Sequence, residues 1–301
     1  MTSSQATPSA TPATSAPITI AQALTQAASL GLARVDAQML LLHAAGQPVH
    51  ARAWLITHDT DALTPEQSTQ WQQLLSRRLQ GEPVAYLIGH KGFYGLELAV
   101  DARVLDPRPD TETLVDWALE YMPTDTPCRV VDLGTGSGAI ALALQSQRPA
   151  AEVWAVDFSA DALAVAQANA QRLNLPVQFA QGSWLQPLQG QAPFDLIVSN
   201  PPYIRADDPH LAALTHEPLA ALASGADGLE DIRSIIDQAP TCLKNGGWLL
   251  FEHGWDQATD VAQLLQAAGF AEVQHRHDLA GIARCTGGRW PIPALEETRA
   301  G

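Results

Sequence analysis

The feature of this sequence that most restricts its fold is a short, mainly apolar run that leads directly into a glycine-rich turn. The run covers residues 129–133, and the turn over 134–138 has glycine at every second position. An apolar run of this length is typical of a strand buried on both faces, and the glycines allow a sharp turn into the helix expected over 137–147. Strand, glycine turn and helix in this order predict an α/β fold with a ligand site at the turn.

The chain from about residue 110 onward continues to alternate between strand and helix patterns. Short apolar runs predict further strands, and longer segments with apolar residues at helical spacing predict helices. The further strands are expected over 152–157, 194–198, 247–251 and 271–277, and the further helices over 159–173 and 257–268. Such alternation specifies a doubly wound, mostly parallel sheet, so we expect one α/β domain over 110–292.

The preceding segment has a helical pattern instead. Over 18–90, apolar residues recur at helical spacing, and Thr64-Pro65-Glu66-Gln67 has the composition of a helix start with a capping box. Residues 92–100 then alternate, which predicts a hairpin. We therefore expect a small helical-bundle domain over 18–90 and a hairpin linker over 91–109. A disordered tail is expected at 1–17, where Ser, Thr, Ala and Pro predominate, and a second tail at 293–301.

Charge and composition argue against several classes of function. The 301 residues carry a formal net charge of −15, with 17 Lys and Arg against 32 Asp and Glu. We expect no direct nucleic-acid partner, because phosphate binding normally requires a basic surface. The cysteines are far apart, and His90, His216 and His253 show no metal-ligand spacing, so we expect no disulfide framework and no metal, in a cytoplasmic chain. No apolar run approaches the ~20 residues that a membrane span needs.

Acidic residues around the glycine turn bear on which cofactor the turn holds. Asp157 ends the next predicted strand, about 20 residues further on, where a carboxylate can accept hydrogen bonds from both ribose hydroxyls. Asp132 favours S-adenosylmethionine, since it could meet the methionine ammonium and would repel a diphosphate. However, Gly134, Gly136 and Ala139 also satisfy the looser dinucleotide pattern. From the turn alone, S-adenosylmethionine, a dinucleotide and a mere tight turn remain open.

A second motif, Asn200-Pro201-Pro202-Tyr203, follows the predicted strand 194–198. A strand-ending turn accounts for the prolines but not for the whole combination. A planar NH2 group offers two donors, which the Asn200 side-chain oxygen and the Pro201 carbonyl can accept while the prolines hold the backbone rigid. Tyr203 supplies an aromatic face for stacking. Together with the glycine turn, the motif predicts methyl transfer to an amide or exocyclic amine nitrogen.

These residues also predict how the transfer is catalysed. The sulfonium methyl is already activated, so the enzyme chiefly positions the two reactants. Hydrogen bonds to Asn200 and Pro201 would orient the nitrogen lone pair toward the methyl group and stabilise the developing positive charge. No strong base is evident, and a proton could leave after transfer. The predicted catalytic residues are Asn200, Pro201 and Tyr203.

With these motifs, the chain resembles the PrmC/HemK family of protein-(glutamine-N5) methyltransferases over nearly all of 18–290. Further family motifs correspond to residues 107–112, 217–222, 227–230 and 251–255. The resemblance implies a Rossmann-like class I methyltransferase domain with a seven-stranded sheet, and S-adenosyl-L-methionine as the cofactor. The implied substrate is the glutamine of the Gly-Gly-Gln motif in class I peptide chain release factors, which the helical domain would recognise. No membrane partner is implied.

Matching motif positions imply roles for individual residues. The implied cofactor contacts are Gly134, Thr135, Gly136, Ser137, Gly138, Asp157, Trp184 and Asn200. The implied contacts with the glutamine amide are Asn200, Pro201, Pro202 and Tyr203. The chain departs from the family pattern at Ser183, at Asp106, at Thr215-His216 and over 281–284, where the surface that docks the substrate could differ.

Two alternative substrates share part of this logic. A ribosomal-protein glutamine methyltransferase would use the same amide site, but residues 108–112 favour the release-factor enzymes. A nucleic-acid methyltransferase acting on an exocyclic amine of adenine or guanine would also use the Asn-Pro-Pro-Tyr motif. It would need a basic groove and base flipping, which the acidic composition disfavours. A dinucleotide-dependent oxidoreductase and a non-catalytic adaptor would each leave that motif unexplained.

Overall fold

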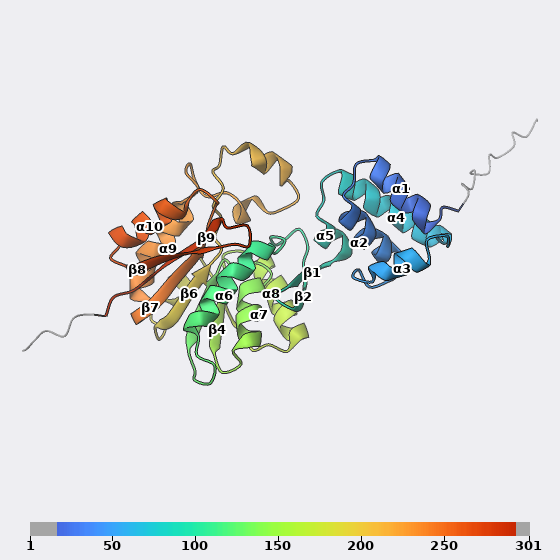
Figure 1. Cartoon of the computed structure of the whole chain (residues 1–301). Coiled ribbons are helices and arrows are strands. Elements are labelled where there is room, and N and C mark those ends of the chain that lie inside the picture. Colours follow the sequence, from blue (N-terminus) through green and yellow to red (C-terminus); the bar gives the residue numbers. More distant parts are fainter. Residues whose placement is uncertain (1–16, 293–301) are drawn as a thin grey trace, which may run out of the picture. The chain divides into compact units, whose positions relative to one another are not determined.

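The structure is a computed structural model in which residues 17–292 are described. The tails expected at 1–17 and 293–301 lie outside this range, apart from Pro17. Contacts divide the chain into two compact units, the first ending at Ile88 and the second beginning at Gly89. Figure 1 shows the elements of both units.

The first unit is a bundle of short helices around one apolar core. Thr64 begins α4 with a capping box, in which its side chain accepts from the Gln67 N–H, as the sequence predicted. Trp71 and Leu40 are fully buried in the core. The helices are α1 (Ile20–Ser29), α2 (Arg34–Ala44), α3 (Arg52–Thr57), α4 (Pro65–Leu79) and α5 (Val84–Ile88).

The second unit contains a hairpin and a seven-stranded sheet with the order β5-β4-β3-β6-β7-β9-β8. Strands β3 to β7 pair in parallel with their neighbours, and β9 runs antiparallel to both β7 and β8. The predicted doubly wound, mostly parallel sheet is therefore confirmed. The helices are α6 (Glu112–Tyr121), α7 (Ala139–Gln147), α8 (Ala160–Leu173), α9 (Glu230–Gln238) and α10 (Ala258–Ala267). The strands are β1 (His90–Phe93), β2 (Leu96–Ala99), β3 (Arg129–Leu133), β4 (Glu152–Asp157), β5 (Gln178–Gln181), β6 (Phe194–Ser199), β7 (Leu243–Glu252), β8 (Ala271–His277) and β9 (Ala283–Arg289).

Helices cover both faces of the sheet, with α6, α7 and α8 on one face and α9 and α10 on the other (Figure 1). Leu133 of β3 belongs to the same buried cluster as Ile235 of α9 and Val261 of α10. On the opposite face, Val153 of β4 packs in a cluster with Ala141 of α7. Burial on both faces explains why β3 and β6 consist mainly of apolar residues, such as Val130, Val131, Leu196 and Ile197.

The hairpin is tied to the α/β domain through a buried asparagine. Tyr94 and Gly95 form its turn with φ values of 48° and 76°, which suits the twist of a two-residue hairpin turn. The Asn169 side chain of α8 accepts from the Ala99 N–H at 2.8 Å and donates to the Ala99 carbonyl at 3.0 Å. It also donates to the Ser137 carbonyl at 3.0 Å. One side chain therefore connects β2, α8 and the glycine turn.

Helix α6 lies close to the sheet where β9 carries a glycine. A Cβ atom on Gly287 would lie 2.5 Å from the Leu250 side chain, 2.7 Å from the Leu249 carbonyl oxygen and 2.9 Å from the Trp117 ring. Trp117 belongs to α6 and is only 1% exposed. The absence of a side chain at Gly287 therefore allows α6 to pack directly on β7 and β9.

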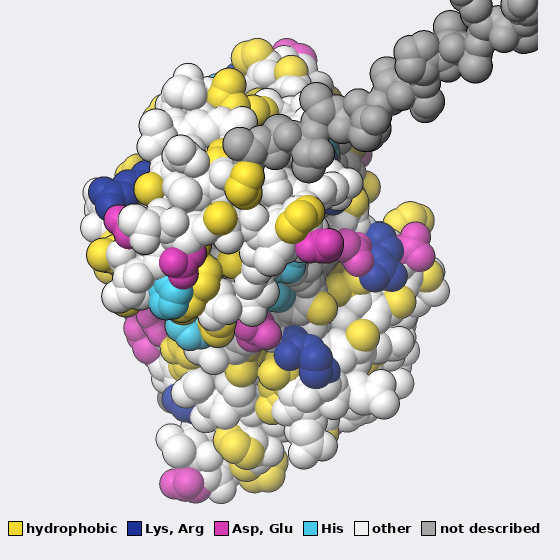
Figure 2. Space-filling view, turned by 90° about the vertical axis from the view of Figure 1, so that its right-hand side faces the viewer, with side chains coloured by type: hydrophobic (Ala, Val, Ile, Leu, Met, Phe, Trp, Pro, Cys, Tyr) yellow, Lys and Arg dark blue, Asp and Glu magenta, His cyan; other side chains and the backbone are white. Residues whose placement is uncertain are grey.

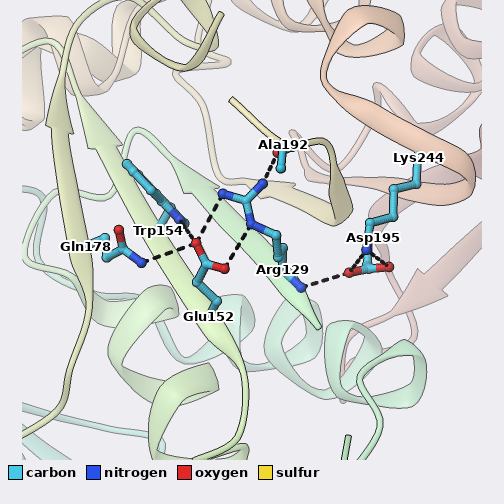
Figure 3. A network of polar contacts seen from close by, with 7 residues as sticks. All are labelled: Arg129, Glu152, Trp154, Gln178, Ala192, Asp195 and Lys244. Carbon is cyan, nitrogen blue, oxygen red and sulfur yellow. Dashed lines mark hydrogen bonds and ion pairs between the residues drawn. The ribbon is translucent and has the colours of Figure 1, made fainter. Parts of the chain in front are cut away.

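The amino ends of the central strands are joined by a polar network, drawn in Figure 3. The Arg129 guanidinium donates to both carboxylate oxygens of Glu152, at 3.0 and 3.1 Å, and its backbone N–H donates to Asp195 at 2.8 Å. Lys244 pairs with Asp195 at 2.8 Å. These side chains lie at the starts of β3, β4, β6 and β7. The network therefore links these neighbouring strands at their amino ends.

Candidate active site

The glycine turn follows β3 and leads into α7. Its three glycines, Gly134, Gly136 and Gly138, have φ values of 70°, 55° and 84°, which residues with a Cβ rarely adopt. The Gly134 and Thr135 N–H groups donate to the Val156 carbonyl at 2.9 and 3.0 Å, so β4 holds the start of the turn. A Cβ on Gly136 would meet nothing within 4 Å. At Gly136 the turn therefore presents bare backbone to open space.

The predicted acidic residue at the end of β4 lies against this turn. Asp157 Oδ2 accepts from the Gly136 N–H at 2.9 Å, and Oδ1 accepts from the Ser159 N–H at 2.9 Å. Burial raises the pKa of the Asp157 carboxyl, and these hydrogen bonds oppose the rise. Each oxygen keeps a further lone pair, so the fixed carboxyl can still accept from a ligand.

Asp132, expected to face a ligand, is wholly buried beneath the turn. Its Oδ2 accepts from the Thr135 hydroxyl at 2.6 Å and from the Ala141 N–H at 3.2 Å. Its Oδ1 has no hydrogen-bond partner within the described part of the chain. Burial raises the pKa of Asp132 to about 7. The residue thus braces the turn internally and retains one unsatisfied acceptor.

Trp184, in the loop after β5, approaches the first glycine of the turn. A Cβ on Gly134 would lie 3.4 Å from the Trp184 ring. The residue is half-buried and has a positive φ of 52°, which is uncommon for a bulky side chain. Such conformations persist where the surrounding structure imposes them, and they concentrate at functional sites. The ring therefore offers an apolar surface beside the turn.

The Asn-Pro-Pro-Tyr segment begins at the end of β6, next to β3 in the sheet. Ser199 pairs with Leu133, and its hydroxyl donates to the Leu133 carbonyl at 2.8 Å, which places Asn200 beside the glycine turn. The Asn200 side-chain NH2 donates to the Thr111 hydroxyl oxygen at 3.2 Å. Pro201 is buried, and Pro202 is half-buried. The structure therefore brings the two predicted motifs together at the carboxyl edge of the sheet.

Two residues outside the Asn-Pro-Pro-Tyr motif, Gly228 and Gln257, lie against the backbone of Tyr203. Its carbonyl accepts from the Gln257 side-chain amide at 3.0 Å. A Cβ on Gly228, whose φ is +76°, would lie only 2.3 Å from that carbonyl oxygen. Burial and the nearby Glu252 carboxyl raise the pKa of the Tyr203 phenol to about 12. Gly228 and Gln257 belong to or adjoin family motifs, but the sequence did not indicate that they support Tyr203.

Two more residues, whose role the sequence did not indicate, lie beside the Asn200 side chain. Thr111 ends the short 3-10 helix η1 (Pro109–Thr111), and Glu252 is the last residue of β7. Glu252 is 2% exposed. Burial raises the pKa of the Glu252 carboxyl to about 7, and hydrogen bonds from the Thr111 and Asn200 side chains oppose the rise. Glu252 lies in the family motif over 251–255 and directly follows a predicted strand, but neither signal indicated a role beside Asn200.

The unusual Asp106 is part of a balanced group of charges. Its carboxylate pairs with Lys91 Nζ at 3.0 Å and with an Arg108 nitrogen at 3.6 Å. Arg108 also donates to Glu217 at 2.6 Å, and Glu217 accepts from the Asp106 N–H at 3.3 Å. Both carboxylates are buried, and two cations face them. The departure from an apolar residue at this position is therefore compensated by Lys91 and Arg108.

The structure places no metal centre at this edge of the sheet. Within residues 17–292, no three His, Cys, Asp or Glu side chains form a group that could hold a metal ion. His253 is buried and contacts the Gly254 carbonyl at 2.8 Å and the Thr286 hydroxyl at 2.6 Å. Burial lowers its pKa to about 4. No helix among these residues is long and apolar enough to cross a membrane.

The fold defines the class to which this protein belongs, the class I methyltransferases. Residues 113–225 match the family described as methyltransferase small domain. A solved methyltransferase from Pyrococcus furiosus shares the fold, with a TM-score of 0.52 and 18% identity, over 73% of this chain and 100% of that chain.

Residues 18–89 match the family described as PrmC N-terminal domain. The release factor glutamine methyltransferase of Bordetella pertussis is 50% identical over 86% of this chain and 95% of its own length. The one from Xylella fastidiosa is 48% identical over 89% of this chain and 98% of its own length. The chain belongs to the release factor glutamine methyltransferase family, and it is an enzyme.

Proposed function

We propose that this enzyme transfers a methyl group from S-adenosyl-L-methionine to the side-chain amide nitrogen of the glutamine in the Gly-Gly-Gln motif of class I peptide chain release factors. The observation that carries the proposal is the position of Asn200 beside the glycine turn, on neighbouring strands of the sheet. The name of the relatives supports the same substrate. Release factors act during translation, so the proposed place of action is the cytoplasm.

The residues around the glycine turn fit S-adenosyl-L-methionine. Gly136 leaves open space beside the Asp157 carboxyl, where ribose hydroxyls could donate. The Trp184 ring beside Gly134 offers an apolar surface to adenine. The unsatisfied Asp132 Oδ1 is a buried acceptor that a ligand cation would suit. The proposed contacts are Gly134, Thr135, Gly136, Ser137, Gly138, Asp157, Trp184 and Asn200.

In this proposal the bound cofactor supplies an activated methyl group, and the protein positions the amide nitrogen that receives it. The Asn200 Oδ1 and the Pro201 carbonyl accept the two N–H groups of the glutamine, which directs its nitrogen lone pair toward the methyl group. The Pro202 and Tyr203 side chains enclose the flat amide. With its pKa raised to about 12, the Tyr203 phenol stays neutral at physiological pH and contributes its ring rather than a charge.

The helical unit is proposed to recognise the protein substrate, with a domain boundary near residue 90. Its match to the PrmC N-terminal domain and its separate core support this role. A chain that begins at Gly89 should still bind S-adenosyl-L-methionine in calorimetry but should methylate intact release factor slowly. Full activity of that shortened chain would give the helical unit another role.

A nucleic-acid substrate is disfavoured by charge. The net charge is −15, and phosphate binding normally requires clustered cations. On the face drawn in Figure 2, the Lys and Arg side chains of the described residues form separate small groups and no continuous band.

The test is methylation of a purified class I release factor by the full chain with labelled S-adenosyl-L-methionine. Mass spectrometry should find one added methyl group on the glutamine of the Gly-Gly-Gln peptide. A release factor with glutamic acid at that position is the matched control and should remain unlabelled. Parallel reactions with intact ribosomes and with cellular nucleic acid test the two alternative substrates. Labelling there, with none on the release factor, would overturn the proposal.

A further inference from the structure

The Thr111 hydroxyl does not cap the helix that Thr111 precedes. Thr111 immediately precedes α6, a position where a Ser or Thr side chain normally accepts from the first helical N–H groups and contributes about 1 kcal/mol. Here the side chain makes no such capping bond. It is 4% exposed, and its oxygen instead accepts from the Asn200 side-chain NH2 at 3.2 Å. The hydroxyl therefore serves Asn200 rather than the helix.

Glu252 completes the same arrangement from a third segment. The Thr111 and Asn200 side chains adjoin its buried carboxyl and oppose the rise that burial causes in its pKa. The second oxygen, Oε2, has no hydrogen-bond partner among residues 17–292. The neighbouring charges, Asp110 and Arg284, pair with each other at 3.6 Å. Glu252 thus forms no ion pair with another described residue, and the polar side chains beside it are those of Thr111 and Asn200.

These contacts determine which end of the Asn200 amide faces the ligand space. The oxygen and nitrogen ends have nearly the same shape, so hydrogen bonds decide between them. With the NH2 directed to the Thr111 hydroxyl, the Asn200 Oδ1 is left to accept from a ligand. A reversed amide would set Oδ1 against the Glu252 carboxyl and would present a donor to the NH2 of a glutamine substrate.

We propose that Thr111 and Glu252 are positioning residues that hold the Asn200 side chain with its oxygen toward the substrate amide. This inference rests on the proposed function, and it adds an explanation of how the Asn200 side chain is oriented. Neither residue needs to touch the substrate. They exclude the reversed orientation of Asn200, in which its NH2 group would face the NH2 group of the glutamine. Their loss should therefore lower the rate of methyl transfer and leave the binding of both reactants nearly unchanged.

The test replaces the Thr111 hydroxyl without changing its shape. Thr111→Val should lower kcat on release factor by about 10- to 100-fold, the usual penalty for a misdirected reacting group. KM for release factor and Kd for S-adenosyl-L-methionine should change by less than about twofold, because binding uses other groups. Thr111→Ser, which keeps the hydroxyl, should restore kcat to within about threefold. Thr111→Ala provides a second hydroxyl-free variant if valine is not accommodated.

The control for general destabilisation is Thr286→Val. Thr286 is fully buried, and its hydroxyl contacts His253 at 2.6 Å and His275 at 2.8 Å rather than Asn200. This variant should lower Tm and leave kcat unchanged. In addition, Thr111→Val should have no further effect in an Asn200→Ala enzyme, because Thr111 acts through Asn200.

The outcomes separate the two proposals. A wild-type enzyme that does not methylate release factor overturns the proposed function and this inference with it. If the wild-type enzyme is active and the hydroxyl-free Thr111 variants keep their kcat, the positioning role alone is wrong. A rise in KM at constant kcat, or a full additive loss in the Asn200→Ala background, also overturns it.

Discussion

Replacement of Gly228 by alanine tests whether the position of Tyr203 depends on the loop beneath it. The new Cβ would lie 2.3 Å from the Tyr203 carbonyl oxygen and 2.8 Å from the Gln257 side-chain nitrogen. Cβ atoms essentially never approach other atoms within 3.0 Å, so the Tyr203 backbone has to retreat by about 0.7 Å. The φ of +76° adds about 1–2 kcal/mol of strain for any residue with a Cβ.

A retreat of this size is a large error for a group that holds a reactant. Misplacement by about 1 Å costs about 100-fold in rate, so Gly228→Ala should lower kcat by about 10- to 100-fold. Binding of S-adenosyl-L-methionine should be nearly unchanged, because the atoms nearest a Cβ on Gly228 belong to Tyr203 and Gln257 rather than to the glycine turn or Asp157. Single-turnover methylation of release factor gives the rate, calorimetry gives the cofactor Kd, and thermal melting gives the stability.

The matched control is Gly190→Ala. Gly190 also has a positive φ, of 80°, but a Cβ there would meet nothing within 4 Å. It precedes β6 and lies at the opposite edge of the sheet from Asn200. The control should therefore lose a similar amount of stability and keep its kcat. If Gly228→Ala is as active as Gly190→Ala, contact with the Tyr203 carbonyl does not set the position of the site.

Three further predictions concern the cofactor, the pH dependence of stability and the amino edge of the sheet. Asp157→Asn should weaken binding of S-adenosyl-L-methionine by about 10- to 100-fold in calorimetry, since hydrogen bonds to a charged acceptor contribute about 1.5–3 kcal/mol; unchanged affinity would remove Asp157 from the cofactor site. The pKa of Asp132 rises from 3.8 to about 7 on folding, so the folded chain holds this proton more tightly and its contribution to stability is lost as pH rises through about 4 to 7. Melting curves should show a flatter pH dependence for Asp132→Asn over that window, and parallel curves for the two proteins would contradict the assignment. Arg129→Gln should lower the free energy of unfolding by about 1–3 kcal/mol in urea titrations, because it breaks the pairing with Glu152. Its kcat should stay the same. A lower kcat per folded molecule would show that the amino ends of the strands also affect the site at their carboxyl ends.

The sequence predicted those structural features that depend on only a few neighbouring residues. The glycine turn requires positive φ at its glycines, and the capping box at Thr64 requires only four neighbouring residues, so both could be predicted. Strands β5 and β9 could not be predicted in the same way. Residues 178–181 form a short segment with glutamine at both ends, and β9 contains Gly287-Gly288, which is typical of a turn. The sheet supplies their hydrogen-bond partners, and this is not visible in the segments themselves.

The supports of the site were missed for a related reason. Thr111 and Asn200 are 89 residues apart, and Gln257 is 54 residues from Tyr203. In sequence, Thr111 is a suitable helix cap, and nothing nearby indicates that its hydroxyl faces another strand. Asp132 is a case in which the sequence indicated only one of two roles. Its place before the glycines suggested a ligand contact, but burial and two hydrogen bonds direct most of its carboxyl into the protein.

The contact of helix α6 with Gly287 makes the site sensitive to a distant part of the sheet. Thr111 stands at the amino end of α6, and Trp117, further along the same helix, rests where Gly287 leaves room. A side chain at Gly287 would lift the helix, and Thr111 would move with it. The reach of the Thr111 hydroxyl to Asn200 is therefore a property of the helix as a whole, and variation at a buried glycine far from Asn200 in sequence is expected to change the enzyme's turnover.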